Sequence, residues 1–338
     1  RRALPDAEVT LIGLPFARDL VERSRHLDRF EPFPGFPGIA EQWFDARAAT
    51  AFLARMQARR FDLALQLHGS GLHSNPFALL LGARFTAGFI RADADPGRLD
   101  VALPWPAALH ERRRSLAFAS FLGAPPDGEA MEFPLVAADL AEADRLLAGL
   151  DPPLIGLHPF AREEAKCWPA AAFRHAARRL RAEIGGSVVI LGGRDDRAAG
   201  DRLAAAIGPP LRNLAGATSL GGLGAVVGRL ALLIGNDSSP AHIASALATP
   251  SVVLFGPTDP AEWGPPADGP HRVVRFDDAY SPAEWHASLE RVVATALAVI
   301  GGDGAERTLG GGMTGAESRH CAPQWGGRAP LRAALKTP

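Results

Sequence analysis

The chain has 338 residues, of which 47% are hydrophobic, and its formal net charge is −1. This length is enough for two domains with separate cores, and the near-neutral charge gives no electrostatic reason to expect nucleic acid as a partner. The two cysteines, Cys167 and Cys321, allow neither a disulfide framework nor a zinc site of the usual cysteine spacing.

The sequence also limits where the protein works. No apolar run approaches the ~18–20 residues of a membrane span, and no apolar segment follows Arg1 and Arg2 as it would in a signal peptide. Few cysteines suit a reducing compartment. We therefore predict a cytoplasmic protein, for which peripheral contact with a membrane surface stays open.

Strands and helices alternate in the first half of the chain. The predicted strands are Val9–Leu14, Phe61–Leu67 and Arg84–Phe89, and the predicted helices are Arg18–Arg25, a segment capped by Asp45 that runs to Arg60, Phe77–Leu81 and His110–Leu122. In the last helix we expect Leu116, Phe118 and Leu122 to face inward. Prolines and glycines predict loops at Phe30–Gly38 and Pro104–Pro106. Residues 1–7 resemble the end of a helix, which suggests that a first strand and most of a first helix precede residue 1.

The predicted strand Phe61–Leu67 runs into a polar loop that contains His68, Ser70, His73 and Asn75. In open α/β sheets, ligands bind at the carboxyl ends of the strands. These side chains are suited to hydrogen-bond a hydroxyl-rich molecule. Alternatively, the segment from Ser74 to Pro76 only begins the next helix.

The second half repeats the alternation more clearly and predicts a parallel βαβ sheet. Its predicted strands are Leu154–His158, Ser187–Leu191, Leu211–Leu214, Leu230–Ile234, Ser251–Phe255 and Val273–Phe276, and its helices are Pro169–Ile184, Asp195–Ile207, Ser219–Arg229, Ala241–Leu247 and Ser281–Ile300. A predicted helix over Ala138–Leu150 comes before this second half and spans the predicted domain boundary. We predict one domain over 1–145, a second over 146–300, and a disordered glycine-rich tail over 301–338.

The turn that follows Leu230–Ile234 is the strongest candidate for a ligand site. Asn236, Asp237 and Ser238 are residue types that cap helices, and Pro240 is favoured in a first turn. A strand that passes through such a turn into a helix aims free backbone N–H groups at one spot, which suits an anion. An ordinary capped turn has the same residues, but His242 lies where it can face this spot, and this favours a ligand site.

Small or polar residues end the other strands of the second half as well, and they would allow a nucleotide to approach the backbone closely. Neither a Walker loop nor G-x-G-x-x-G is present, which disfavours P-loop NTPases and nicotinamide enzymes. Lys166 precedes a predicted helix, where its charge could neutralise a diphosphate. The plainer interpretation is a solvated lysine on a charged loop.

Six motifs occur in an order that resembles glycosyltransferase family 9, the ADP-heptose:lipopolysaccharide heptosyltransferases and their relatives. They are His158-Pro159, Lys166-Cys167-Trp168-Pro169, Leu191-Gly192-Gly193, Asn213–Gly216 with Thr218-Ser219-Leu220, Asn236–His242 and Phe255–Thr258. In the first half, the Gln66–Asn75 loop and Leu81–Arg84 also fit. The resemblance covers about residues 1–300.

The resemblance implies an α/β protein of GT-B fold, with two Rossmann-like domains whose parallel sheets face a cleft. It implies inverting transfer of a heptose-like sugar from a nucleotide diphosphate sugar to a glycan or lipid-linked acceptor, such as the lipopolysaccharide core, without a metal or another cofactor. The donor would be bound by Lys166, Gly193, Asn213, Leu214, Asp237, Ser238, His242 and Thr258, and the acceptor would lie beside His68, Ser70, His73 and Asn75.

The sequence departs from the family pattern in two ways. Ser239 stands where the family usually has glycine, which would strain the turn if that position needs a positive φ. The family's base aspartate follows the first strand of the first domain, and no residue here matches it, so we assign no catalytic base. Two alternatives follow: a nucleotide-sugar-binding protein that does not transfer, and a GT-B sugar-nucleotide epimerase.

Overall fold

The computed structural model describes residues 1–91, 97–124, 128–276 and 282–301, which form two compact units that divide between Glu129 and Ala130. The predicted helix Ala138–Leu150 is α5 (Ala137–Leu147), and it packs against α8 (Leu220–Val227) in the second unit. The domain limits 1–145 and 146–300 would assign most of α5 to the first domain. The predicted tail lies, from residue 302 onward, outside the described residues.

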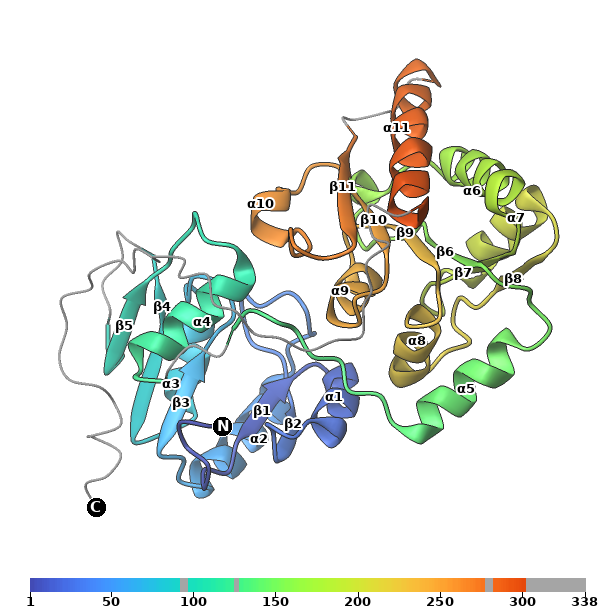
Figure 1. The fold of residues 1–338 in the computed structure, drawn as a ribbon. Coiled ribbons are helices and arrows are strands. Elements are labelled where there is room, and N and C mark those ends of the chain that lie inside the picture. Colours follow the sequence, from blue (N-terminus) through green and yellow to red (C-terminus); the bar gives the residue numbers. More distant parts are fainter. Residues whose placement is uncertain (92–96, 125–127, 277–281, 302–338) are drawn as a thin grey trace, which may run out of the picture. The chain divides into compact units, whose positions relative to one another are not determined.

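The first unit has two small parallel sheets. One pairs β1 with β2, and the other has the order β3-β4-β5. The strands are β1 (Thr10–Gly13), β2 (Arg29–Pro32), β3 (Leu63–Gln66), β4 (Phe85–Ile90) and β5 (Val101–Pro104), and the helices are α1 (Arg18–Arg23), α2 (Ala46–Ala58), α3 (Ser74–Leu80) and α4 (Glu111–Phe121) (Figure 1). Phe52, Met56 and Phe77 pack in one core cluster, and Phe89 packs with Phe118 in another.

Two predictions for the first unit are wrong. Residues 29–32, predicted largely as loop, form β2, and strand β5 ends at Pro104, where a loop was expected. In α4, Phe118 is buried as expected, but Leu116 and Leu122 are only partly buried, and Arg114 is buried instead.

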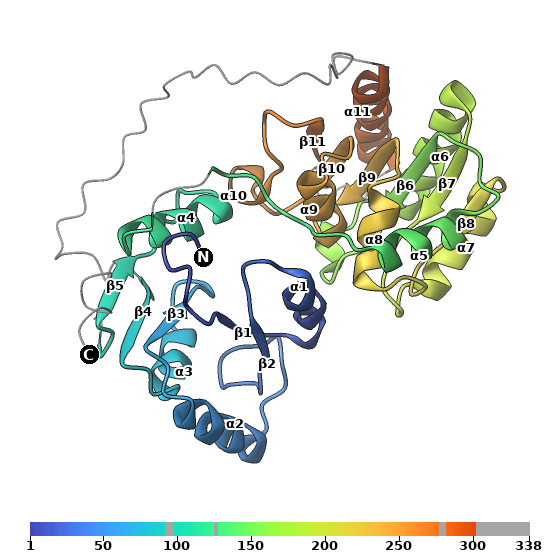
Figure 2. The ribbon, with the colours of Figure 1, turned by 60° about the horizontal axis from the view of Figure 1, so that its bottom comes forward.

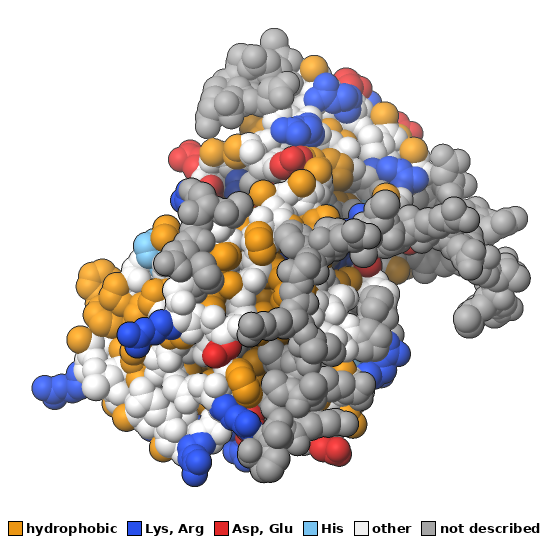
Figure 3. All heavy atoms as spheres, turned by 90° about the vertical axis from the view of Figure 1, so that its left-hand side faces the viewer, with side chains coloured by type: hydrophobic (Ala, Val, Ile, Leu, Met, Phe, Trp, Pro, Cys, Tyr) orange, Lys and Arg blue, Asp and Glu red, His pale blue; other side chains and the backbone are white. Residues whose placement is uncertain are grey.

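The face shown in Figure 3 has hydrophobic side chains interspersed with charged side chains of both signs.

The second unit contains one six-stranded sheet in which all strands run parallel, in the order β8-β7-β6-β9-β10-β11. Its strands are β6 (Leu154–His158), β7 (Ser187–Ile190), β8 (Leu211–Asn213), β9 (Leu232–Asn236), β10 (Ser251–Phe255) and β11 (His271–Arg275). The predicted bounds of β6 and β10 are confirmed. Strand β9 begins and ends two residues later than predicted. It extends to Asn236 because Gly235 pairs with β6 and Asn236 pairs with β10.

Helices cover both faces of this sheet. The remaining helices are α6 (Ala170–Ile184), α7 (Arg197–Ile207), α9 (Ser239–Ala246), α10 (Pro260–Trp263) and α11 (Pro282–Gly301). Successive strand residues enter opposite cores, since Leu232 and Ile234 pack with α6, α7 and α11, whereas Leu233 packs with α5, α8 and α9. Figure 2 shows α5 beside α8. Of the described helices, none is long and apolar enough to cross a membrane.

Candidate functional site

The candidate site lies where β6 and β9 meet at the centre of the second unit's sheet. Chain order runs outward from β6 through β7 to β8 on one side, and from β9 through β10 to β11 on the other. Such a reversal leaves a crevice at the carboxyl ends of the two central strands, where open α/β sheets bind ligands. His158 ends β6, Asn236 ends β9, and Gly256 follows β10. The topology therefore gathers these three turns at one edge.

Helix α9 begins directly after β9, with Ser238 as its N-cap residue and Pro240 in its first turn. The Ser238 side chain does not cap the helix. Its Oγ is instead 2.9 Å from His158 Nδ1 and donates to the Asn236 carbonyl at 3.1 Å. Because no side chain caps α9, N–H groups of its first turn remain available to an anion. The alternative of an ordinary capped turn, in which the Ser238 side chain would cap α9, is therefore not what the structure has.

Asp237 is the centre of the polar cluster at this turn. Its carboxylate is 3.9 Å from Lys166 Nζ and 4.0 Å from His242 Nε2, and it accepts a hydrogen bond of 2.9 Å from Thr258 Oγ1. The Asp237 side chain is 8% exposed, whereas those of Lys166 and His242 are 24% and 44% exposed. The structure thus brings together four predicted donor residues, and it leaves the side chains of Lys166 and His242 partly exposed to solvent.

The segment that carries Lys166 leads into a buried tryptophan, Trp168, two positions further on. Lys166 ends a short 3₁₀ turn, Glu164–Lys166, and the chain then extends through Cys167 into Trp168. The Trp168 backbone N–H donates to Asn236 Oδ1 at 3.0 Å, and its indole Nε1–H donates to Ser288 Oγ at 2.8 Å. Trp168 is therefore anchored both to the end of β9 and to α11.

His158 belongs to the site although it was not among the predicted donor residues. Burial lowers the pKa of His158 to about 4, so the ring is neutral near pH 7. A side chain on Gly235 would press against His158, which explains why β9 has glycine at this position. The available signal was His158 itself, a polar residue at the end of a predicted buried strand.

Three predicted donor residues use their groups elsewhere. Gly193 N–H donates to Asp196 Oδ2 at 2.7 Å. The Asn213 side chain donates to Asp201 and to the Arg197 carbonyl of α7 and accepts from the Ala215 N–H just after β8, and Leu214 is buried in the core. The Asn213 amide is therefore occupied by local hydrogen bonds, and the Leu214 side chain is enclosed in the core.

The predicted acceptor residues lie in the first unit, and they differ in exposure. His68 is exposed and lies 3.5 Å from Glu41, while His73 is exposed at the start of α3. Ser70 is partly buried on the same loop. Asn75 points inward, where its Nδ2 donates to the Phe89 carbonyl at 2.8 Å and its Oδ1 has no partner among the described atoms. Asn75 thus ties α3 to β4 instead of facing outward.

Three further observations concern the site. Ser239 is the first residue of α9, and it is not among the described non-glycine residues of positive φ, which are Arg60 and Ala248. The strain considered for Ser239 is therefore absent. Within the described part of the chain, no three His, Cys, Asp or Glu side chains are grouped to hold a metal ion. Burial raises the pKa of the Cys167 thiol beside Lys166.

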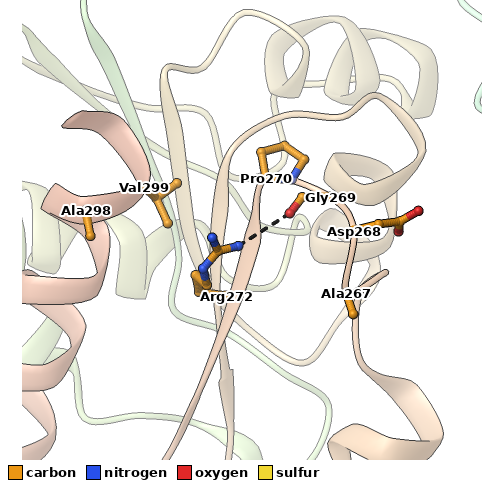
Figure 4. Close-up of a pocket in the computed structure, with 7 residues that line it drawn as sticks. All are labelled: Ala267, Asp268, Gly269, Pro270, Arg272, Ala298 and Val299. Carbon is orange, nitrogen blue, oxygen red and sulfur yellow. Dashed lines mark hydrogen bonds between the residues drawn. The ribbon is translucent and has the colours of Figure 1, made fainter. Parts of the chain in front are cut away.

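A cavity of about 270 Å³ lies elsewhere in the second unit. Figure 4 shows its lining, which comes from the segment that leads into β11, from β11 itself and from the end of α11 (Ala267, Asp268, Gly269, Pro270, Arg272, Ala298 and Val299). Arg272 donates to the carbonyl of Gly269 at 3.4 Å. The cavity is at the amino end of β11, whereas Asp237 follows the carboxyl end of β9. It is not part of the candidate site.

Solved structures of heptosyltransferases share this fold. The ADP-heptose lipopolysaccharide heptosyltransferase II of E. coli matches with a TM-score of 0.67 at 23% identity, over 88% of this chain and 91% of that chain. The E. coli heptosyltransferase WaaC, solved with ADP, matches with a TM-score of 0.65 at 19% identity, over 87% and 92%. The fold is therefore GT-B, with Rossmann-like α/β units built on parallel sheets.

The sequence comparison defines the family. A model described as glycosyltransferase family 9 (heptosyltransferase) matches residues 49–283, and the chain belongs to this family. A curated relative, lipopolysaccharide heptosyltransferase 3 of Escherichia coli, is 40% identical over 121 residues, which are 35% of each chain. The chain thus matches about a third of the length of the first curated relatives.

Proposed function

We propose that the chain transfers a heptose-like sugar from a nucleotide diphosphate sugar to a glycan acceptor such as the lipopolysaccharide core. The reaction would invert the anomeric carbon and need no metal. The observation that carries this proposal is the cluster at the switch point of the second unit, where Lys166 and His242 flank Asp237 beside the uncapped start of α9. Membership of glycosyltransferase family 9 supports it.

The cluster has the chemistry that this reaction needs. The leaving group is a nucleoside diphosphate, and negative charge grows on it as the sugar departs. Lys166 and the N-terminus of α9 would stabilise that charge with an ammonium group and with backbone N–H groups. Asp237 is suited to accept hydrogen bonds from sugar hydroxyls, because an ionised carboxylate only accepts. Thr258 would hold the Asp237 carboxylate in place.

The donor is proposed to be ADP-heptose-like. The names of the relatives support the sugar, and the E. coli enzyme WaaC was solved with ADP. The acceptor is proposed to bind the first unit beside His68, Ser70 and His73, which lie on the loop after β3. Asn75 would support this loop from below through its bond to Phe89. We assign no residue as the base that takes the acceptor proton.

The test is a transfer assay with ADP-heptose and a purified lipopolysaccharide-core acceptor. Mass spectrometry of the acceptor and measurement of ADP release would show transfer, and NMR of the new linkage would give its anomeric configuration. Activity that persists in EDTA would support a metal-independent reaction. Binding of ADP-heptose without transfer would favour the alternative of a nucleotide-sugar-binding protein, and an epimerised donor would favour an epimerase. Absence of both binding and transfer would overturn the proposal.

A further inference from the structure

Asn236 joins two parts of the site that are distant in the sequence. It ends β9, is completely buried, and accepts a hydrogen bond of 3.0 Å from the backbone N–H of Trp168, 68 positions away. Lys166 lies two residues before Trp168, and Asp237 directly follows Asn236. This one hydrogen bond therefore links the segment that presents Lys166 to the turn that presents Asp237.

The bond acts on the backbone of this segment, whereas the other contacts of Trp168 act on its side chain. The indole ring packs edge-on against Phe173 at 5.0 Å between centroids and donates to Ser288 Oγ. Those contacts hold the indole ring, whereas the bond to Asn236 holds the peptide group between Cys167 and Trp168. Because Lys166 Nζ is 3.9 Å from Asp237, beyond hydrogen-bond distance, a small backbone movement would change which atoms the ammonium meets.

The other polar group of the Asn236 side chain, the amide NH₂, makes no hydrogen bond to a described residue that would stabilise the fold. Its Nδ2 is buried and has no hydrogen-bond partner among the described atoms. An unpaired buried donor lowers stability, and such departures are expected mainly at functional positions. Aspartate would accept the same bond, but it would bury a second negative charge beside Asp237. A neutral amide oxygen at this position can accept the Trp168 bond without adding charge, which suits a residue that positions the site.

We propose that Asn236 is a positioning residue, which holds Lys166 in place through the Trp168 N–H so that the ammonium meets the diphosphate of the donor. Asn236 itself is buried and does not touch the donor. The inference rests on the proposed function, in which the second unit binds a nucleotide diphosphate sugar. It differs from a purely structural role because it predicts a defect confined to the phosphates and dependent on Lys166.

A double-mutant cycle on ligand affinity tests this role. The variants are Asn236→Leu, which roughly keeps the side-chain volume, Lys166→Ala and the double variant, and the probes are ADP and adenosine, measured by calorimetry. We expect Asn236→Leu to weaken ADP binding roughly tenfold and to change adenosine binding less than about twofold. In the double variant, ADP should bind about as it does to Lys166→Ala alone, because both changes remove the same contact.

Ser251→Ala is the matched control. Ser251 is a fully buried polar residue of the neighbouring strand β10, and its hydroxyl is 2.9 Å from His271 Nδ1, at the opposite edge of the sheet. This variant should lose stability and keep its ADP affinity. Additive effects of Asn236→Leu and Lys166→Ala, equal losses for ADP and adenosine, or unchanged ADP affinity would each overturn the proposal.

A measurement on the unaltered chain covers the case in which Asn236 variants do not fold. Hydrogen exchange at the Trp168 amide should be as slow as in the core of β9, and exchange as fast as at an exposed loop amide would show that the tether is absent. Failure of the unaltered chain to bind ADP would count against the donor assignment. Normal ADP binding by the unaltered chain, together with additive effects of Asn236→Leu and Lys166→Ala on ADP affinity, would reject the role of Asn236 and leave the donor assignment standing.

Discussion

Lys166 Nζ and Asp237 Oδ2 face each other at 3.9 Å, with the ammonium a quarter exposed and the carboxylate nearly buried. A partly exposed pair at this distance contributes little to stability, because solvent screens it and the side chains lose entropy. The lysine is therefore free to serve a ligand. This makes it possible to remove Lys166 without unfolding the second unit.

We expect Lys166→Ala to weaken the binding of ADP and ADP-heptose by about 1.5–3 kcal/mol, the value of a hydrogen bond to a charged group. Adenosine binding should hardly change, because adenosine lacks the diphosphate. Calorimetric titration of both ligands measures the difference. Arg162→Ala is the control, since Arg162 is exposed on the same segment. Equal losses for adenosine and ADP would return Lys166 to the role of a solvated surface lysine.

Asp237→Ala should reduce donor use at least tenfold while stability falls by no more than about 1 kcal/mol, because Asp237 accepts one hydrogen bond from Thr258 and is not the N-cap of α9. Asp45→Ala provides the opposite pattern. Asp45 is a true N-cap, whose side chain accepts from Ala48 N at 2.7 Å. Its loss should cost about 1 kcal/mol and leave donor use intact. Chemical denaturation measures the stability of both variants, and initial rates measure their use of the donor. A large loss of stability for Asp237→Ala would mean that Asp237 has a structural role.

Stability should fall as the pH drops from about 6.5 to about 4, because burial lowers the pKa of His158 to about 4. In that window the unfolded chain binds a proton that the folded chain does not, so acid favours unfolding. The full contribution of His158 to the free energy of unfolding is present above the unfolded pKa. The size is on the order of 3 kcal/mol. Denaturation of His158→Gln at several pH values should show a flatter profile. An unchanged profile would mean that His158 is protonated without unfolding.

Arg114 should be the most sensitive charged residue of α4. Its side chain is 2% exposed, forms an ion pair of 2.7 Å with Glu111, donates to the carbonyls of Pro106 and Ala107, and lies over the Trp105 ring. We expect Arg114→Ala to destabilise the chain by about 3 kcal/mol, since it removes a buried guanidinium and leaves two partly buried carbonyls and the Glu111 carboxylate without this partner. Arg113→Ala, at a 57% exposed position, should change stability by less than about 0.5 kcal/mol. Similar values for the two variants would contradict this account.

Local patterns predicted the elements of the second unit well and missed two strands of the first. β6 and β10 are short apolar runs buried on both faces, so their bounds follow from composition. β2 and β5 each end in a proline, at Pro32 and Pro104, and each lies at the edge of its sheet. Proline is tolerated at such an edge, where no neighbour needs its N–H, but in a sequence it indicates a loop.

The candidate site was predictable only where residue type reveals role. Lys166, Asp237, Ser238, His242 and Thr258 were named from motifs, and the structure places them around one turn. The role of Asn236 was not predicted beyond its being a residue type that can cap a helix, because its bond to Trp168 spans 68 positions and no local pattern shows it. Asn75 and Asn213 have polar side chains typical of ligand contacts, but both are occupied by bonds to nearby elements.

The strand order has a consequence for how the protein is made. β6 is the first strand of its sheet to be synthesised, yet its neighbour on the site side is β9, and His158 meets Ser238 across 80 positions of chain. A nascent chain that has just completed β8 already carries His158, Lys166 and Trp168, but their polar partners Ser238, Asp237 and Asn236 are still missing. Such distant pairing is slow. The anion site therefore forms late, when β9 pairs with β6. Before that step, β6 is the exposed edge strand of the sheet, and a chaperone or protease can bind it there.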